Sequence, residues 1–292
     1  KDYVWKSDTV ENRGQYVSHG TQVSGIIAAH KDGEGIHGVA YDAELVGANI
    51  DYYGNGSAHM GQAEKALHDI VKLKSTEAQG GEAMNIVAVN MSFNKGRQQP
   101  HYGTITQLED GTFSSSVVTN RMEDGGGAKY WKIGTDNDIV LVNSAGNGMY
   151  MADGTTNYDF SLDPGIYATE TDSNGDLVLG GKMIIVGNWG GTKEDGQVVG
   201  SKSGHVCLDI VANKCNDQYQ VKDFYILAPG FVDSTTPQDG YAINNGSSFS
   251  APQVTGAMGI LHQMWPHMKG ENLVKLVLNT ADKDINGYDE NI

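Results

Sequence analysis

Basic residues, cysteines, prolines and long hydrophobic runs are all scarce in this chain. Its 292 residues hold 20 Lys and Arg against 36 Asp and Glu, a formal net charge of -16. Because nucleic-acid binding depends on clustered cations, we expect no nucleic-acid partner. No apolar run approaches the roughly 20 residues that a membrane-spanning helix needs, and residues 1–5 do not resemble a signal peptide. We therefore expect a soluble chain, processed or truncated at its start.

Only 2 cysteines and 6 prolines occur. Cys207 and Cys215 are close enough to close a small loop, which would stabilise the fold by about 2–3 kcal/mol and imply an oxidising compartment. Two buried free thiols are the alternative, because spacing does not establish disulfide geometry. No flexible or proline-rich linker divides the chain, which favours one domain over residues 1–292.

Apolar, β-rich runs alternate with helical patterns along the chain. The pattern predicts strands at 44–50, 85–92, 138–143, 183–187 and 224–228, and helices at 21–29, 60–74, 248–264 and 271–279. The strands are continuously rather than alternately apolar, which suits strands buried on both faces. The predicted fold is therefore α/β, in three layers, with a mostly parallel central sheet flanked by helices. We interpret 95–127 as a surface insertion and expect a hairpin turn at Asn174-Gly175.

Three segments carry candidate chemistry. Ser248 lies in Gly-Ser-Ser-Phe-Ser-Ala-Pro at the start of a helical pattern, where unpaired N–H groups and the helix dipole can stabilise an anion. His19 begins the run His-Gly-Thr before an apolar helix, and Asn147 ends Ala-Gly-Asn after a strand. Taken singly, these residues are more often a helix cap, a structural histidine and an ordinary turn.

Together, and in this order, the three segments resemble the subtilisin family of serine endopeptidases. The resemblance implies that Ser248 is the nucleophile, His19 its general base and Asn147 the oxyanion-hole donor. It also implies hydrolysis of peptide bonds in protein or peptide substrates through an acyl-enzyme intermediate, with no required cofactor. Subtilisins often bind structural calcium, so calcium is expected at a site that the sequence does not identify.

The resemblance extends to the substrate-binding strand. Ser92, Phe93 and Asn94 end an apolar run that resembles the strand on which an extended peptide adds in this family. Ser144, Ala145 and Gly146 would form the other wall of the main specificity pocket. The family often has small glycines where this chain has Phe93 and Asn94, so no preference for the substrate residue at the cleavage site is assigned.

Residues 28–40 and the stretch from Cys207 to Gly230 are similar to bacterial autotransporter serine proteases. This resemblance implies a secreted or surface-exposed protein, with any membrane contact made through a C-terminal barrel that is absent from this chain. Together with the short spacing, it predicts that Cys207 and Cys215 are bonded.

A subtilisin-like triad also needs a carboxylate beside the histidine. Only Asp2 and Asp8 precede His19, and neither fits the family pattern of an apolar strand ending in Asp-Thr-Gly or Asp-Ser-Gly. We expect that the strand with this Asp is missing, that a short N-terminal peptide could supply it, and that the chain alone is catalytically weak.

Other functions are less well supported. A non-catalytic adhesin or binding module on a subtilisin scaffold is the alternative that this gap leaves open. An α/β-hydrolase is excluded, because its Gly-x-Ser-x-Gly motif is absent: no serine has glycine both two residues before it and two residues after it. The stretch from Asp282 to Gly287 opens like a calcium loop but lacks its later ligands, and His262 and His267 lack a third zinc ligand, so no metal site is assigned.

Overall fold

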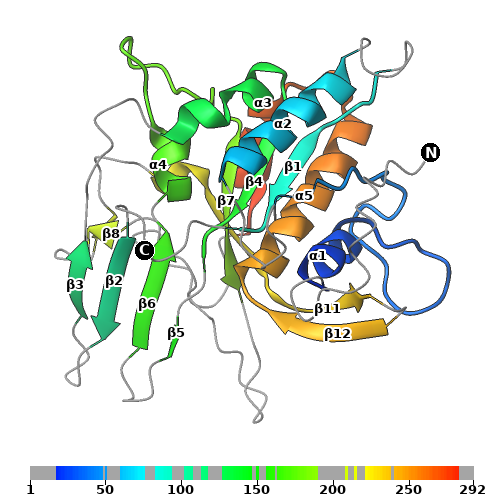
Figure 1. Cartoon of the computed structure of the whole chain (residues 1–292), viewed down its shortest axis with the longest axis horizontal. Helices are drawn as coiled ribbons and strands as arrows, with labels where there is room; N and C mark the ends of the chain where they lie inside the picture. Colours follow the sequence, from blue (N-terminus) through cyan, green and yellow to red (C-terminus); the bar gives the residue numbers. More distant parts are fainter. Residues whose placement is uncertain are drawn as a thin grey trace.

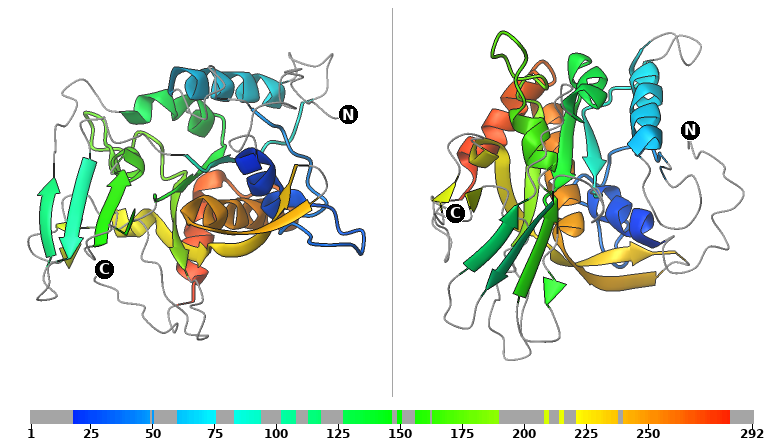
Figure 2. Two further views of the ribbon diagram at one scale, coloured as in Figure 1. Left: turned by 60° about the horizontal axis from the view of Figure 1, so that its bottom comes forward. Right: turned by 60° about the vertical axis from the view of Figure 1, so that its left-hand side comes forward.

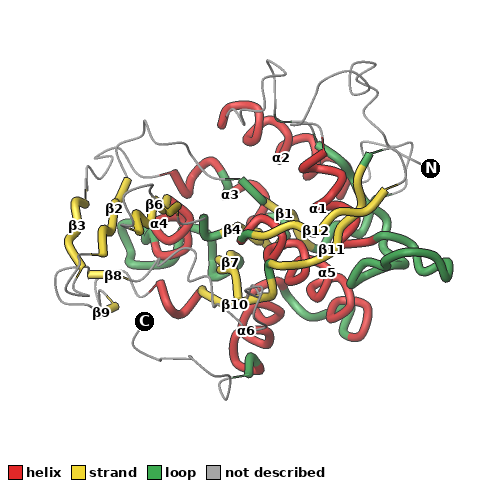
Figure 3. Tube along the Cα trace, turned by 90° about the horizontal axis from the view of Figure 1, so that it is seen from below, coloured by secondary structure: helices red, strands yellow, loops and turns green. Residues whose placement is uncertain are grey.

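A computed structural model describes the chain in fourteen stretches. They are residues 18–48, 50, 60–75, 83–93, 102–107, 113–117, 127–146, 149–150, 156–161, 163–189, 208–209, 214–215, 221–237 and 240–282. Figure 1 shows a central sheet with helices packed on both sides, and Figure 3 shows the same layers from below.

Among the described residues, the central sheet has four parallel strands in the order β1-β4-β7-β10. Their bounds are β1 Ala88–Met91, β4 Val140–Ser144, β7 Met183–Trp189 and β10 Tyr225–Pro229. Parallel pairing requires crossover connections, and helices cover both faces of the sheet. The predicted three-layer α/β architecture is thereby confirmed.

Successive side chains of the two central strands enter two different cores. Leu141 and Met183 pack with Leu67 of helix α2 (Met60–Lys74), whereas Val142 and Ile184 pack with Met258 of helix α5 (Ser247–Met264). Because side chains alternate across a strand, a strand covered on both faces must be apolar at every position. This requirement explains the continuous hydrophobic runs in the sequence.

The remaining elements surround these layers. The helices are α1 Ser18–Ala28, α3 Lys132–Asp136, α4 Asp163–Thr169, α6 Gly270–Thr280 and the short 3₁₀ helices η3 Gly127–Tyr130 and η4 Val221–Phe224. An antiparallel sheet has the order β3-β2-β6-β5, from Phe113–Val117, Tyr102–Gln107, Thr156–Ser161 and Met149–Tyr150. Two hairpins pair β8 (Leu208–Asp209) with β9 (Lys214–Cys215), and β11 (Phe231–Thr236) with β12 (Gly240–Asn245). The antiparallel sheet and the β11–β12 hairpin lie at opposite ends of the molecule (Figures 1 and 2).

Most predicted elements are present. Helix α2 has the predicted bounds, and helices α1, α5 and α6 differ by a few residues at their ends. The turn at Asn174-Gly175 is also confirmed: Gly175 has φ 85°, and Thr171 and Leu177 form an antiparallel bridge across it. Strands β2 and β3 lie within 95–127, a segment in which the sequence shows no clear periodicity.

One predicted strand is wrong. Residues 44–48 and 50 of the predicted strand 44–50 have no regular structure, and Leu45 is 43% exposed. Among the described residues this run has no hydrogen-bonded neighbouring strand, and apolar composition alone does not make a strand without one.

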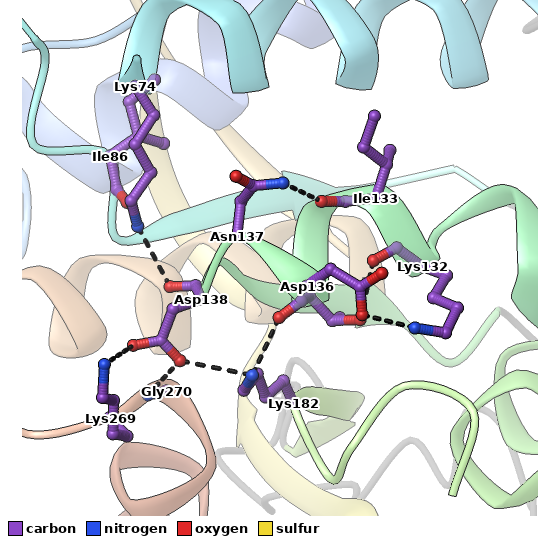
Figure 4. A network of polar contacts seen from close by, with 11 residues as sticks. Lys74, Ile86, Lys132, Ile133, Asp136, Asn137, Asp138, Lys182, Lys269 and Gly270 are labelled. Carbon is purple, nitrogen blue, oxygen red and sulfur yellow. Dashed lines mark hydrogen bonds and ion pairs between the residues drawn. The ribbon is translucent and has the colours of Figure 1, made fainter. Parts of the chain in front are cut away.

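A polar cluster lies at the amino-terminal ends of the strands (Figure 4). Asp138, just before β4, adopts φ 58° and accepts a hydrogen bond from the Gly270 N–H at the start of α6. Its carboxylate lies 3.4 Å from Lys182 Nζ and 3.9 Å from Lys269 Nζ. Lys74 donates to the main-chain oxygens of Ile86 and Asp138. This cluster joins helices from both layers to the central sheet.

The described residues hold neither a membrane-spanning helix nor a metal-binding cluster. None of their helices is both long and apolar enough to cross a membrane. They also contain no group of three or more His, Cys, Asp or Glu side chains arranged to hold a metal ion.

Candidate active site

The candidate residues gather at the carboxyl-terminal edge of the central sheet. Met91 of β1 pairs with Asn143 of β4, so Ser92 and Ser144 lie at the same edge. The amino terminus of α5, which carries Ser247 and Ser248, reaches the same edge, because the Ser92 hydroxyl donates to the main-chain oxygen of Ser248. In open parallel sheets, ligands bind at this edge.

His19 and the nucleophile segment come together from opposite ends of the chain. The His19 ring, in the first turn of α1, meets the Phe249 ring edge to face, with centroids 5.6 Å apart. Phe249 directly follows Ser248 in α5, so this contact places the candidate base at the turn of α5 that carries the candidate nucleophile. Burial lowers the pKa of His19 below the ordinary value for histidine. The neutral imidazole, the form that accepts a proton, is therefore favoured.

A glycine, Gly246, directly precedes helix α5 and lies two residues before the candidate nucleophile. Gly246 precedes the helix with φ 136°, a conformation that side chains rarely tolerate, and its N–H donates to the Gly230 oxygen. Ser248 is the second residue of the helix, where main-chain N–H groups have no acceptor within the helix. These groups and the positive end of the helix dipole can stabilise negative charge beside Ser248.

Ser247 connects the helix to the loop after β4. Its hydroxyl lies 2.9 Å from the Gly146 oxygen, to which it donates, and 3.1 Å from the Gly146 nitrogen, from which it accepts. Ser247 is fully buried. Gly146 directly precedes Asn147, so this pair of hydrogen bonds fixes the main chain at the base of the candidate oxyanion loop.

The two strand ends are held together by Asn143. Its side-chain amide is 3.0 Å from the Met91 oxygen and 3.2 Å from the Phe93 oxygen. Ser144 and Ala145 are buried, with 1% and 0% exposure. The next residue, Gly146, is partly exposed, so a substrate would meet this segment at Gly146.

Phe93 packs into the molecule. Its ring lies 6.4 Å from that of Trp131, which in turn lies 6.2 Å from Tyr167. Phe93 borders the core under helix α2. The aromatic ring that made the depth of the specificity pocket uncertain in the sequence thus contributes to the core.

Four residues that join the elements of the site were not predicted from the sequence: Ser247, Asn143, Asn90 and Thr255. A sequence signal existed for Asn143, because a polar residue ends an otherwise apolar strand. Some predicted residues lie outside the described part of the chain: Asn94, Asn147, Cys207, Asp2 and Asp8, and for Cys215 only the main chain is described. Their roles, and the disulfide, stay predictions.

Comparison with known proteins agrees with this geometry. The model of the Subtilase family matches residues 2–291. An extracellular serine protease of Serratia marcescens is 23% identical over 325 aligned residues, which cover 98% of this chain and 28% of that protein. Fervidolysin of Fervidobacterium pennivorans is 27% identical over 278 residues, covering 93% of this chain and 32% of the relative. The chain thus spans about a third or less of the curated relatives that it matches.

Solved structures show the same fold. Sphericase superposes with a TM-score of 0.57 at 20% identity, over 90% of this chain and 69% of that chain. The crystal structure of fervidolysin gives a TM-score of 0.55 at 21% identity, over 94% and 34%. The family model matches nearly the whole of this chain, and the sheet and helices have the same fold as the solved structures. The chain therefore belongs to the Subtilase family, the subtilisin-like serine proteases.

Proposed function

We propose that the chain is the catalytic domain of an endopeptidase that hydrolyses peptide bonds through an acyl-enzyme intermediate. The contact of His19 with Phe249 at the start of α5 carries the proposal, because it brings base and nucleophile to the same place. The proposal rests also on membership of the Subtilase family.

In the proposed reaction, Ser248 Oγ attacks the scissile carbonyl carbon while His19 accepts the hydroxyl proton. The oxyanion that forms is stabilised by the Ser248 N–H and the Asn147 side chain. His19 then gives its proton to the leaving amine as the C–N bond breaks, which leaves an acyl group on Ser248. A water molecule then attacks the acyl carbonyl while His19 accepts its proton. The bond to Ser248 Oγ breaks, His19 returns the proton to Oγ, and the carboxylic acid product leaves.

The substrate binds in an extended conformation against the main chain of residues 92–94 and of 144–146. In this proposal, recognition through main-chain hydrogen bonds accounts for the polar strand ends. In this proposal the enzyme is secreted and acts outside the cell. The Serratia relative, which is named an extracellular serine protease, supports this location. A Cys207–Cys215 disulfide and surface exposure of the autotransporter type belong to the same proposal, as does structural calcium.

A fluorophosphonate probe, which reacts covalently with activated serines, tests this function. We expect mass spectrometry to find one adduct, on Ser248, in the unsubstituted protein, and no adduct in Ser248→Ala or, at comparable times, in His19→Ala. Ser24→Ala is the matched control, because Ser24 is an exposed serine in α1, and it should label normally. An adduct that persists in folded Ser248→Ala would exclude Ser248 as the nucleophile, whereas no labelling of the unsubstituted protein would favour a non-catalytic binding module.

A further inference from the structure

Helix α5 has a proline that changes the surroundings of the candidate nucleophile. In an α-helix the Ser248 oxygen would accept the N–H of residue 252, but that residue is Pro252, which has no N–H. The main-chain oxygen of Ser248 therefore loses its ordinary helical donor. An oxygen in this position requires a donor from outside the helix.

Ser92 is the donor. Its hydroxyl lies 2.7 Å from the Ser248 oxygen, across 156 residues of sequence. The Ser92 oxygen in turn accepts from Asn90 Nδ2 at 2.9 Å, and Thr255 Oγ1 lies 3.1 Å from Asn90 Oδ1. A row of three hydrogen bonds thus runs from Thr255 through Asn90 and Ser92 to the nucleophile.

The direction of these hydrogen bonds is fixed by the last acceptor in the row, the main-chain oxygen of Ser248. A carbonyl oxygen only accepts, so the Ser92 hydroxyl must donate to Ser248 and can only accept from Asn90. The Asn90 amide must then point its NH₂ group at Ser92 and its oxygen at Thr255, whose one hydroxyl proton is shared between Asn90 Oδ1 and the Ala251 oxygen, each 3.1 Å from Oγ1. Hydrogen bonds aligned in one direction strengthen one another.

The row also fixes the helix at two places. Ser248 and Thr255 lie about two turns apart on α5, and both are joined through Asn90 and Ser92 to the end of β1. Thr255 is 7% exposed, so its hydroxyl is held away from bulk water. Rotation or sliding of α5, which would move Ser248 Oγ, therefore has to stretch or break these hydrogen bonds.

We infer that Asn90 and Thr255 are positioning residues for Ser248. They act through the Ser92 hydroxyl, which holds the Ser248 main chain so that its Oγ meets the scissile carbon. This inference rests on the proposed function. Correct placement of a nucleophile contributes to the rate of the chemical step rather than to substrate affinity.

Thr255→Val tests the inference, because valine keeps the shape of threonine without its hydroxyl. We expect fluorophosphonate labelling of Ser248 and kcat on a peptide substrate to fall about three- to tenfold, the effect of one neutral hydrogen bond. KM should not change. Thr255→Ser, which keeps the hydroxyl, should restore most of the rate.

The matched control is Thr280→Val. Thr280 Oγ1 donates to the main-chain oxygen four residues earlier in α6, and Thr255 Oγ1 likewise lies 3.1 Å from the Ala251 oxygen. The control therefore removes a hydroxyl that makes a comparable local contact far from Ser248, and it should label at the normal rate. If Thr255→Val does not fold, Asn90→Asp replaces it, since a carboxylate cannot donate to Ser92.

A double substitution makes the test specific to this row. If Thr255 acts through Ser92, Thr255→Val should have no further effect on the labelling rate in a Ser92→Ala background. Independent, multiplying effects would overturn the inference, as would normal labelling of folded Thr255→Val. If the unsubstituted protein does not label at all, the proposed function fails first, and this inference fails with it.

Discussion

At the scale of single residues, two adjacent serines have different tasks. In the proposed reaction Ser248 supplies the nucleophilic side chain, whereas the buried Ser247 uses its hydroxyl to hold the Gly146 main chain. The Ser247 hydroxyl donates to the Gly146 oxygen and accepts from the Gly146 nitrogen, so it fixes the main chain directly before Asn147.

The first residue-scale prediction concerns Asn147. If its amide stabilises the oxyanion only as the charge forms, Asn147→Leu should lower kcat by about 10²–10³-fold, a range known from subtilisin itself. KM should change little. Steady-state kinetics on a peptide substrate checks this, and a loss confined to KM would make Asn147 a substrate-binding residue instead.

A second prediction follows from the buried position of His19. Burial lowers its pKa, so the neutral base should persist below the usual histidine range, and the acid limb of kcat/KM should fall below about pH 6.5. Activity is then present above this limb and lost as the pH falls through it. A limb above that value would contradict the prediction and would indicate a carboxylate beside the ring.

At the scale of elements, helix α1 is placed by close packing. Gly25 is buried against β11, and a Cβ there would lie 2.1 Å from Thr235 Oγ1, the group that donates to the Thr21 oxygen. The chain after α1 folds back and donates from Val39 and Ala40 to the last carbonyls of the helix. The position of His19 thus depends on contacts made two turns farther along α1.

Gly25→Ala should therefore destabilise the protein by about 1–3 kcal/mol, the usual effect of overpacking. Gly20→Ala in the same helix is the control, since a Cβ at Gly20 meets nothing within 4 Å, and it should be neutral or stabilise by up to about 1 kcal/mol. Denaturant unfolding measures both. Equal stability of the two variants would show that α1 can move away from Thr235.

Elements of this kind were only partly predictable. Helix α2 and strands β4 and β7 were predicted correctly because their burial patterns repeat over many residues. The predicted strand at 44–50 failed because a strand needs a partner, which a single run of residues does not reveal. The hydrogen bond from Ser92 to Ser248 joins residues 156 positions apart, so no local pattern could have indicated it.

At the scale of the whole molecule, the polar cluster around Asp138 lies at the opposite edge of the sheet from the active site. One carboxylate there faces Lys182 and Lys269, with Lys74 close by (Figure 4). In a chain of net charge -16, three lysines around one aspartate are a local excess of positive charge. Removal of that carboxylate would leave the ammonium groups to repel one another.

Asp138→Asn should lower the free energy of unfolding by about 1 kcal/mol, because the ion pairs with Lys182 and Lys269 are lost while the amide oxygen can still accept from Gly270. The labelling rate of Ser248 in the folded protein should not change. Asp136→Asn is the control, since the Asp136–Lys132 pair is exposed and should contribute little. Thermal unfolding with both variants separates the two, and equal losses would contradict a central role for Asp138.

Because Phe93 packs against Trp131, the fluorescence of Trp131 should respond to changes at residues 92–94. Trp131 is 2% exposed, whereas Trp265, after the end of α5, is 43% exposed. Emission from the buried indole should lie at shorter wavelength than that from the exposed one. A peptide that binds along residues 92–94 would displace or tighten Phe93 and so alter the blue part of the spectrum. Substrate binding could then be followed without a label, even in a Ser248→Ala variant that cannot turn the substrate over.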